Sequence, residues 1–409
     1  MTTINNNSDV EHVARVLKQV AEYGDKFTNG DPAARLKLLA SARELVLAAE
    51  TPVESLQWNI WALPTRWVAS RIALDLKIFE TAVENGGCPK SDEDLAAATG
   101  ASPILVKRIS RICVSMGMLS EHGPGLYVPN SLTKLLAIKE YAAGIIFSFD
   151  VSQLSFTKMP EYLRGTNFQD PNNSLDGPFQ YAYGDSSSTF SWLKDHPDLL
   201  EAFHDYIYTI RTHRPTWTDM YPVHSHLIKG LKPDGDASAL IDIGGGPGQG
   251  LEKFRQAIPQ YTGRLVLQER VEVVTVAKER GVDADGRIEL QVHDFFSPQP
   301  IKGARAYFMR SIMHDWPDHK CQEILSQLKD AMEPGYSKIL ISDPVVSDQQ
   351  PAWQHISLDL YMMAHLSSRE RTEREWHVLM EGCGLEIVGI YSKGEGNESL
   401  IEVIRPVSD

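Results

Sequence analysis

A histidine and two acidic residues stand where they could move a proton. His314 follows a short apolar run, residues 304–309, and precedes a stretch with helical spacing, so we expect it where a strand meets a helix. A histidine there has a suitable pKa for taking a proton from a hydroxyl near neutral pH. Asp343 and Glu370 are expected at other loop positions on the same edge of the sheet. These acids could orient the ring and stabilise its charged form, which makes His314 the candidate general base among 13 histidines.

A glycine-rich loop forms a second candidate site. Residues 239–250 read ALIDIGGGPGQG, and their apolar run predicts a buried strand with Asp242 near its end. The loop glycines, Gly244 and Gly246 among them, lack side chains, which lets the backbone approach a ligand closely. Residues 251–258 have helical spacing. Strand, glycine loop and helix are the first unit of a nucleotide-binding α/β domain.

The spacing of the loop separates its candidate ligands. The dinucleotide fingerprint requires a further glycine, but the chain has Gln249 at that place counted from Gly244 and Leu251 counted from Gly246. The loop also lacks the lysine and hydroxyl residue that end a P-loop. An acid at the strand end, Asp242, suits a cationic ligand better than a pyrophosphate.

Two later strand ends carry further acids. The strand predicted at residues 264–267 runs into Glu269, which could accept both hydroxyls of a ribose. Another strand ends near Asp294 and Phe295, an acid for an adenine amino group and a ring to lie against the base. A lone glycine loop is weak evidence, since many are only tight turns. Three strand-end acids in this order favour S-adenosylmethionine as the cofactor.

Composition limits the partners and the compartment. With 409 residues the chain is long enough for two or three domains. A formal net charge of -14 argues against a general affinity for nucleic acid or an anionic membrane. No run approaches the roughly 20 apolar residues that span a bilayer, and the polar first residues lack the layout of a secretory signal. Four cysteines without paired or metal-like spacing fit a reducing cytosol, so we expect a cytoplasmic protein.

The first part of the chain predicts a module that packs subunits together. Residues 10–80 read as successive helices, and residues 55–76 carry Trp58, Trp61 and Trp67 among aliphatic residues. From Ser91 the order becomes helix, turn, helix and β-hairpin, as in a winged helix. A DNA-binding regulator is therefore the non-enzyme alternative. The basic residues in the second helix are few, and the chain is acidic, which favours the subunit-packing interpretation.

An aromatic-rich helical connector follows, at residues 134–214. Most of its rings are expected in a core, but some could line a pocket for a flat organic substrate. The candidate pocket residues, including three methionines from later segments, are Phe147, Phe179, Tyr183, Met313, Met362 and Met363. Further strands are predicted at residues 338–342, 386–391 and 399–404, the last two as an antiparallel finish to a parallel sheet.

Three motifs together resemble a known family. They are DIGGGPG at the glycine loop, HDW at His314–Trp316 and RERTEREW at residues 369–376. The chain is similar, over residues 41–404, to the caffeate- and flavonoid-type O-methyltransferases, above all to the fungal branch that acts on polyketides. The resemblance implies an α/β fold, with a Rossmann-like class I methyltransferase domain and an N-terminal all-α, winged-helix dimerisation domain. It also implies an intertwined homodimer. The expected division is residues 1–135 for dimerisation, 136–215 for the connector and 216–409 for catalysis.

The resemblance assigns roles to the candidate residues. Asp242, Gly244 and Gly246 would line the cofactor, Glu269 would bind its ribose, and Asp294 with Phe295 its adenine. Arg310 stands where plant members use a lysine near the cofactor. His314 matches the catalytic base, and Asp343 and Glu370 match the acids that flank it.

The chain departs from the family pattern at three places. Glu269 replaces the usual aspartate and is followed by Arg-Val where the family has Leu-Pro. Asp343 is one methylene shorter than the glutamate of many plant members. Residues 206–208, Tyr-Ile-Tyr, lack the methionine that plant members place against the cofactor.

These assignments predict methyl transfer without a metal. His314 would remove the proton of a phenolic or enolic hydroxyl as that oxygen attacks the sulfonium methyl group. The acceptor would be a polyketide-like secondary metabolite. An alternative remains on the same fold, because some fungal relatives catalyse pericyclic reactions with the cofactor bound as a cation. Those proteins tend to replace the histidine of HDW with a basic residue, so an intact His314 favours methyl transfer.

Overall fold

The chain forms two compact units, Met1–Ile145 and Ile146–Asp409. The computed structural model describes residues 10–212, 214–232, 238–394 and 396–407. Residues 1–9, on which the expected lack of a secretory signal depends, lie outside the described residues. The predicted connector belongs, from Ile146 onwards, to the larger unit. The division into three parts at residues 135 and 215 stays a prediction.

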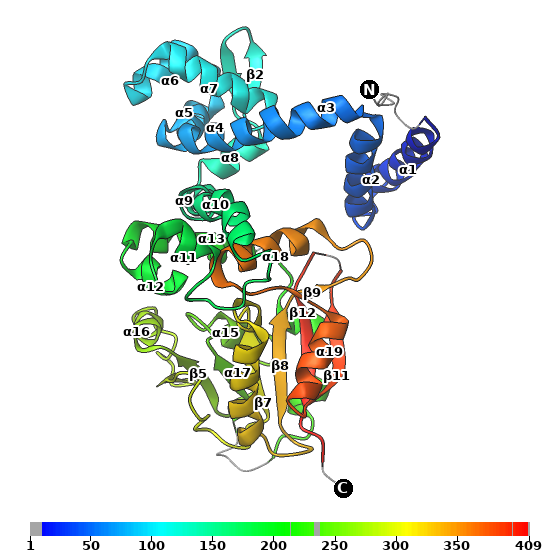
Figure 1. The fold of residues 1–409 in the computed structure, drawn as a ribbon, viewed down its shortest axis with the longest axis vertical. Coiled ribbons are helices and arrows are strands. Elements are labelled where there is room, and N and C mark those ends of the chain that lie inside the picture. The colour runs from blue at the N-terminus through cyan, green and yellow to red at the C-terminus, as the bar shows by residue number, and fades with distance from the viewer. Residues whose placement is uncertain (1–9, 213, 233–237, 395, 408–409) are drawn as a thin grey trace. The chain divides into compact units, whose positions relative to one another are not determined.

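The smaller unit is mostly helical (Figure 1). Ser91 begins α6 with a capping box, in which its side chain and that of Asp94 each accept a backbone N–H of the other residue. The predicted order of two helices and a hairpin between residues 91 and 128 is confirmed, and β1, β3 and β2 form one antiparallel sheet. The elements are α1 (Val10–Thr28), α2 (Ala34–Ala49), α3 (Pro52–Gln57), η1 (Trp58–Ala62), α4 (Leu63–Asp75), α5 (Ile78–Val83), η2 (Glu84–Gly87), β1 (Lys90–Ser91), α6 (Asp92–Thr99), α7 (Pro103–Ser115), β2 (Ser120–Gly123), β3 (Leu126–Val128), α8 (Ser131–Leu136) and α9 (Lys139–Phe147).

The larger unit begins with a helical layer and continues with a helix-covered sheet (Figure 1). The helical layer holds η3 (Ser148–Ser152), α10 (Gln153–Gly165), α11 (Pro178–Tyr183), α12 (Thr189–Lys194), α13 (Pro197–Thr212), α14 (Trp217–Met220) and η4 (His224–Ile228). The elements that follow are β4 (Leu240–Ile243), α15 (Gln249–Ala257), β5 (Leu265–Glu269), α16 (Val271–Glu279), β6 (Ile288–Val292), β7 (Ala306–Arg310), η5 (Met313–Asp315), α17 (Asp318–Ala331), β8 (Lys338–Asp343), β9 (Val345–Val346), α18 (Trp353–Leu366), β10 (Arg371–Thr372), α19 (Glu373–Gly382), β11 (Glu386–Ser392) and β12 (Ser399–Ile404).

The sheet has the strand order β11-β12-β8-β7-β4-β5-β6. The pairs from β8 to β6 are parallel, whereas β12 pairs antiparallel with both β8 and β11. The predicted antiparallel finish is therefore confirmed. The chain moves from β4 to β5 on one side and returns to β7 on the other, so the strand order reverses at β4. Ligands of such sheets bind in the crevice at this reversal, beyond the carboxyl ends of the strands.

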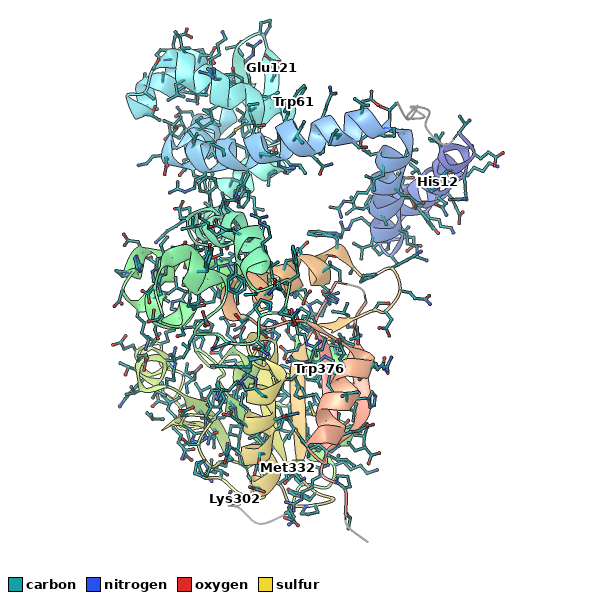
Figure 2. The ribbon with its side chains drawn as sticks, viewed as in Figure 1. His12, Trp61, Glu121, Lys302, Met332 and Trp376 are labelled. Atoms are coloured by element: carbon teal, nitrogen blue, oxygen red, sulfur yellow. The ribbon has the colours of Figure 1, made fainter. Side chains whose placement is uncertain are left out.

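Alternation along the strands divides the core between the two faces of the sheet. Ile241 and Ile243 face one cluster, which they share with α17 and α19, including Trp376 of α19 (Figure 2). Leu240 faces the other cluster, which includes Leu251 of α15 and residues of α14 and η4. Both faces are thus covered by helices, as continuous apolar strands require.

The glycine loop is fitted closely around Asp242. A β-carbon at Gly245 would lie 2.4 Å from the carboxyl carbon of Asp242, and one at Gly250 would lie 2.5 Å from its Oδ2 atom. Gly244 and Gly246 have positive φ angles of 63° and 57°, which favour glycine for a different reason. The first turn of α15 can therefore pack against the strand only without side chains at these positions.

We predict that Gly250→Ala destabilises the protein by about 1–3 kcal/mol, because its new methyl group would overlap Asp242 and lie 2.9 Å from the Phe308 ring. Gly165→Ala is the matched control, since no atom lies within 4 Å of a β-carbon there. Urea unfolding of both variants measures the difference. A Gly250→Ala protein as stable as Gly165→Ala would show that the loop relaxes freely.

Candidate active site

The predicted site residues converge on one edge of the larger unit. Asp242 is the last but one residue of β4, Arg310 is the last residue of β7, and Asp343 is the last residue of β8. His314 lies in η5, directly after β7, and Glu370 immediately precedes β10. Because the carboxyl ends of parallel strands meet at the same edge, these residues come together from distant parts of the chain.

His314 is held between two carboxylates. Its Nδ1 atom lies 2.8 Å from Oε1 of Glu370, and its Nε2 atom lies 3.4 Å from Oδ1 of Asp315. The backbone N–H of Glu370 donates in turn to Asp359 on α18, at 2.8 Å. The side chains of His314 and Glu370 are both buried. Since the close contact of Glu370 occupies Nδ1, Nε2 is the nitrogen that can exchange a proton with a ligand, beside the longer contact with Asp315.

The acids around His314 favour its charged form. Burial acts to lower the pKa of His314, but Glu370, Asp315 and Asp343 together raise it to about 10. Burial raises the pKa of Asp343 to about 7, with the His314 cation opposing the shift. Asp343 is completely buried, and neither of its oxygens has a hydrogen-bond partner among the described residues. Asp343 therefore acts on His314 through its charge, whereas Glu370 makes the hydrogen bond.

A buried arginine fastens the segment that carries His314. The guanidinium of Arg371 donates to the carbonyls of Met313 and Trp316, at 3.0 and 2.8 Å, and to Oδ1 of Asp318. The hydroxyl of Ser368 donates to the carbonyl of His314. Residues 368–371 thus hold both sides of η5. Arg371 lies in the motif at residues 369–376, but the sequence did not predict a role for it. An arginine in a run of charged residues gives no signal that it is buried.

Asp242 and Glu269 form the acidic side of the glycine loop. Burial and the nearby Glu269 raise the pKa of Asp242 to about 7, while Arg211 and Arg310 oppose the shift. Neither oxygen of Asp242 makes a hydrogen bond of normal geometry among the described residues. Glu269 accepts the backbone N–H of Gly246 at 3.1 Å and that of Arg270 at 2.8 Å. Burial is also the main cause of the raised pKa of Glu269.

Arg310 is part of a charged cluster that sequence reasoning did not foresee. Its guanidinium donates to both oxygens of Glu398, at 2.7 and 3.2 Å, and Ser342 donates to the same carboxylate. Burial raises the pKa of Asp242 and Asp315, and Arg211 of α13 lies close enough to oppose that rise. Arg310 and Arg211 both contribute to the lowered pKa of Glu398. Arg211 and Glu398 come from segments with no motif, so only the folded chain reveals them.

The residues assigned to the adenine lie at the exposed rim of the sheet edge. Asp294 is exposed and accepts the backbone N–H of Phe296 at 3.0 Å. The Phe295 ring lies beside the glycine loop, 3.8 Å from where a β-carbon of Gly244 would stand. A ring at this place can lie against a flat ligand that enters over the loop.

The candidate pocket residues occupy different layers. Phe147, which ends α9 inside the larger unit, joins Phe179 and Tyr183 of the helical layer in one aromatic cluster through His365. The rings of Phe179 and Tyr183 stack at 4.5 Å between their centres. Met362 and Met363 are half-buried on α18. Met313 is completely buried in the core that α17 and α19 share with the sheet.

The edge fits a cationic, ribose-bearing cofactor. Asp242 and Asp343 are buried carboxyl groups that make no hydrogen bond of normal geometry among the described residues, so they favour positive charge beside them. The loop admits a ligand against its backbone, and Glu269 faces the same loop. Asp242, Glu269 and the glycine loop would hold S-adenosylmethionine in this arrangement.

Comparisons with known proteins identify the family of the chain. Residues 167–386 match the O-methyltransferase domain family, and residues 69–139 match the O-methyltransferase dimerisation domain. O-methyltransferase mpaG of Penicillium brevicompactum is 33% identical over 392 residues, which cover 95% of this chain and 98% of the relative. Demethylsterigmatocystin 6-O-methyltransferase of Aspergillus parasiticus is 36% identical and covers 80% of this chain and 81% of its own.

Solved structures share the fold. The complex of LepI with S-adenosylmethionine has 27% identity and a TM-score of 0.83, and the match covers 97% of this chain and 100% of that one. OxaC in complex with sinefungin and meleagrin, at 23% identity and a TM-score of 0.85, covers the same shares and supports the fold alone. The predicted class I methyltransferase fold and its cofactor are therefore confirmed, and the chain belongs to the S-adenosylmethionine-dependent O-methyltransferases.

Proposed function

We propose that this enzyme methylates a phenolic or enolic hydroxyl of a polyketide-like metabolite, with His314 as the general base. The observation that carries the proposal is the contact between Nδ1 of His314 and Glu370 inside a buried acidic cluster. The acceptor class is supported by the aromatic residues of the helical layer. It is also supported by relatives, one of which is named for the 6-O-methylation of demethylsterigmatocystin.

The residues at the sheet edge have different roles in the proposed reaction. With Nδ1 of His314 held by Glu370, Nε2 takes the proton of the acceptor hydroxyl. Glu370, Asp315 and Asp343 stabilise the resulting imidazolium. When bound, S-adenosylmethionine supplies an electrophilic methyl group and a positive charge at this edge. A positive charge there lowers the pKa of His314 from its high value in the free protein, so that the ring can act as a base. Alignment of the two reactants contributes most of the rate.

A second candidate function is a pericyclic reaction on the same site. It is favoured by the similarity to a solved structure described as a pericyclic reaction enzyme, at 27% identity and a TM-score of 0.84. A protonated His314 could donate a hydrogen bond to a cyclising substrate. The intact His314–Glu370 pair favours methyl transfer, since proton removal needs a base that is oriented and charge-stabilised.

We further propose a homodimer built around α3, η1 and α4. Large apolar residues of this stretch are exposed in the single chain, and Trp61 is 63% exposed (Figure 2). The others, each at least 43% exposed, are Leu56, Trp58, Ile60 and Leu63. Burying one large aromatic side chain removes on the order of 150–250 Å² from water, so a partner subunit is the expected cover. The match to a dimerisation domain supports this assembly.

No helix of the described residues is long and apolar enough to cross a membrane, and the cytosolic location stays a prediction.

His314→Gln should lower turnover by about 10²–10⁴-fold, because the general base is lost, while the affinity for S-adenosylhomocysteine changes little. Glu370→Gln should lower turnover less, since the base remains. The control is His319→Gln, an exposed histidine five residues away. Labelled S-adenosylmethionine and a panel of hydroxylated aromatics, demethylsterigmatocystin included, report methylated product and S-adenosylhomocysteine together. Product formed without S-adenosylhomocysteine would support the pericyclic alternative, and full activity of His314→Gln would refute the base.

The pH dependence of kcat/KM should carry the signature of the acidic cluster. Glu370, Asp315 and Asp343 favour protonated His314, so kcat/KM should rise with pH above neutrality as the proton leaves. Glu370→Gln removes a negative charge and should move this rising limb to lower pH. The comparison uses one acceptor at saturating cofactor. A limb that stays in place in Glu370→Gln would belong to ionisation of the acceptor instead of His314.

Light scattering should give twice the 45.7 kDa mass of one chain at micromolar concentration. The double variant Ile60→Ser/Trp61→Ser should weaken this dimer, because it removes two exposed apolar side chains of the proposed interface. Val378→Ser, which removes an equally exposed residue on α19, should leave it intact. A monodisperse monomer of the unaltered protein would contradict the proposal.

A further inference from the structure

His365 has a buried imidazole ring that makes no hydrogen bond among the described residues. It lies near the end of α18, its residue is 6% exposed, and neither ring nitrogen has a partner among the described residues. A neutral imidazole carries one N–H donor and one acceptor lone pair. Leaving both unpaired in a protein interior is unfavourable and uncommon, so the arrangement requires an explanation.

Aromatic rings surround His365. The Tyr361 ring is nearly parallel to it, at 8° and 6.1 Å between centres. The Phe147 ring stacks on it at 23° and 6.1 Å between centres, and the centre of the Phe179 ring lies at 5.8 Å. Burial among these rings lowers the pKa of His365 to about 4, so the ring is neutral at physiological pH. Apolar faces offer no partner for either nitrogen.

Another histidine of the same helix shows that α18 can satisfy such a group. His355 is 7% exposed, and its Nε2 atom pairs with the carbonyl of Asn397 at 3.0 Å. Two serine hydroxyls near the start of the helical layer repeat the pattern of His365. Ser152 and Ser155 are completely buried on η3 and α10, both of which contact α18, and neither hydroxyl has a partner among the described residues.

His365 is connected to the catalytic segment along the chain. Residues 368–371 follow it directly and hold His314 through Ser368, Glu370 and Arg371. Asp359 of the same helix accepts the backbone N–H of Glu370. The backbone carbonyl of His365 is itself fixed, because Thr189 of α12 donates to it. The His365 ring therefore lies on the same helix, α18, that positions Glu370 beside His314.

We propose that His365 recognises a second oxygen of a flat aromatic acceptor, a ring carbonyl or hydroxyl remote from the oxygen that is methylated. The inference rests on the proposed O-methyltransferase function. The neutral ring donates to a carbonyl or accepts from a hydroxyl, while the aromatic faces pack against the plane of the acceptor. Acceptors without this oxygen leave the imidazole unpaired and are rejected on that account.

A stability comparison tests whether the ring is unpaired in the free protein. His365→Phe keeps a ring of similar shape and removes both polar atoms, so its Tm should equal or exceed that of the unaltered protein. His355→Phe, the matched control, breaks a hydrogen bond and should lower the Tm. A fall in Tm for His365→Phe as large as that for His355→Phe would show that His365 is a structural residue and would overturn the proposal.

A matched pair of ligands tests recognition. 2-Hydroxyanthraquinone and 2-hydroxyanthracene share one flat tricyclic frame and one phenol, and only the first carries ring carbonyls. With S-adenosylhomocysteine bound, the unaltered protein should bind the quinone on the order of tenfold more tightly, as one hydrogen bond allows. His365→Phe should remove this preference without weakening the anthracene. A preference that persists in His365→Phe, or that the unaltered protein lacks, would overturn the proposal.

The proposed methyl transfer and the proposed role of His365 can be refuted separately. Methyl transfer to the hydroxylated aromatic panel and its loss in His314→Gln test the proposed function. If methylation occurs and His365→Phe treats both tricyclic ligands as the unaltered protein does, only the role of His365 is wrong. If no acceptor is methylated although S-adenosylhomocysteine binds, the proposed function itself fails.

Discussion

The contact between Nδ1 of His314 and Glu370 is the interaction on which the active site depends. It commits Nδ1 to Glu370 and so fixes the direction in which Nε2 points. The two residues are 56 positions apart, so the contact exists only when η5 and the segment before β10 are held together. Arg371 does this from a buried position by bonding to the carbonyls of Met313 and Trp316. A small hydrogen-bonded scaffold thus sets the geometry of the base.

The same edge holds two buried carboxyl groups whose negative charge is unfavourable without a cation beside them. Asp242 and Asp343 are buried and make no hydrogen bond of normal geometry in the described part of the chain, and burial raises the pKa of each to about 7. Such groups reduce the stability of a fold. They favour a cationic ligand on one side and an imidazolium on the other, so the arrangement exchanges stability for affinity and catalysis. His365 is a comparable case with a neutral group, because its buried ring nitrogens have no hydrogen-bond partner among the described residues.

The sequence predicted those parts of the site that follow from local pattern. Apolar runs located β4, β7 and β8, and parallel strands end at one edge, which brought Asp242, Arg310 and Asp343 to the same place. Arg211, Glu398 and Arg371 could not be found this way, because their contacts depend on how distant segments approach each other. In the loop, the sequence predicted close approach of a ligand at Gly244 and Gly246. The tightest packing occurs at Gly245 and Gly250, since the side chain of Asp242 turns toward α15. That direction is a property of tertiary structure.

The central claim is that an acidic cluster makes His314 a base whose charge responds to the cofactor. Nuclear magnetic resonance titration of ¹⁵N-labelled histidine tests it directly, with the His314 signal assigned by its loss in His314→Gln. The account predicts an imidazolium at pH 7 in the free protein, because the pKa of His314 is raised to about 10. It also predicts a marked fall of that pKa when S-adenosylmethionine binds. A His314 pKa at or below 6.5 in the free protein, unchanged by the cofactor, would contradict the account.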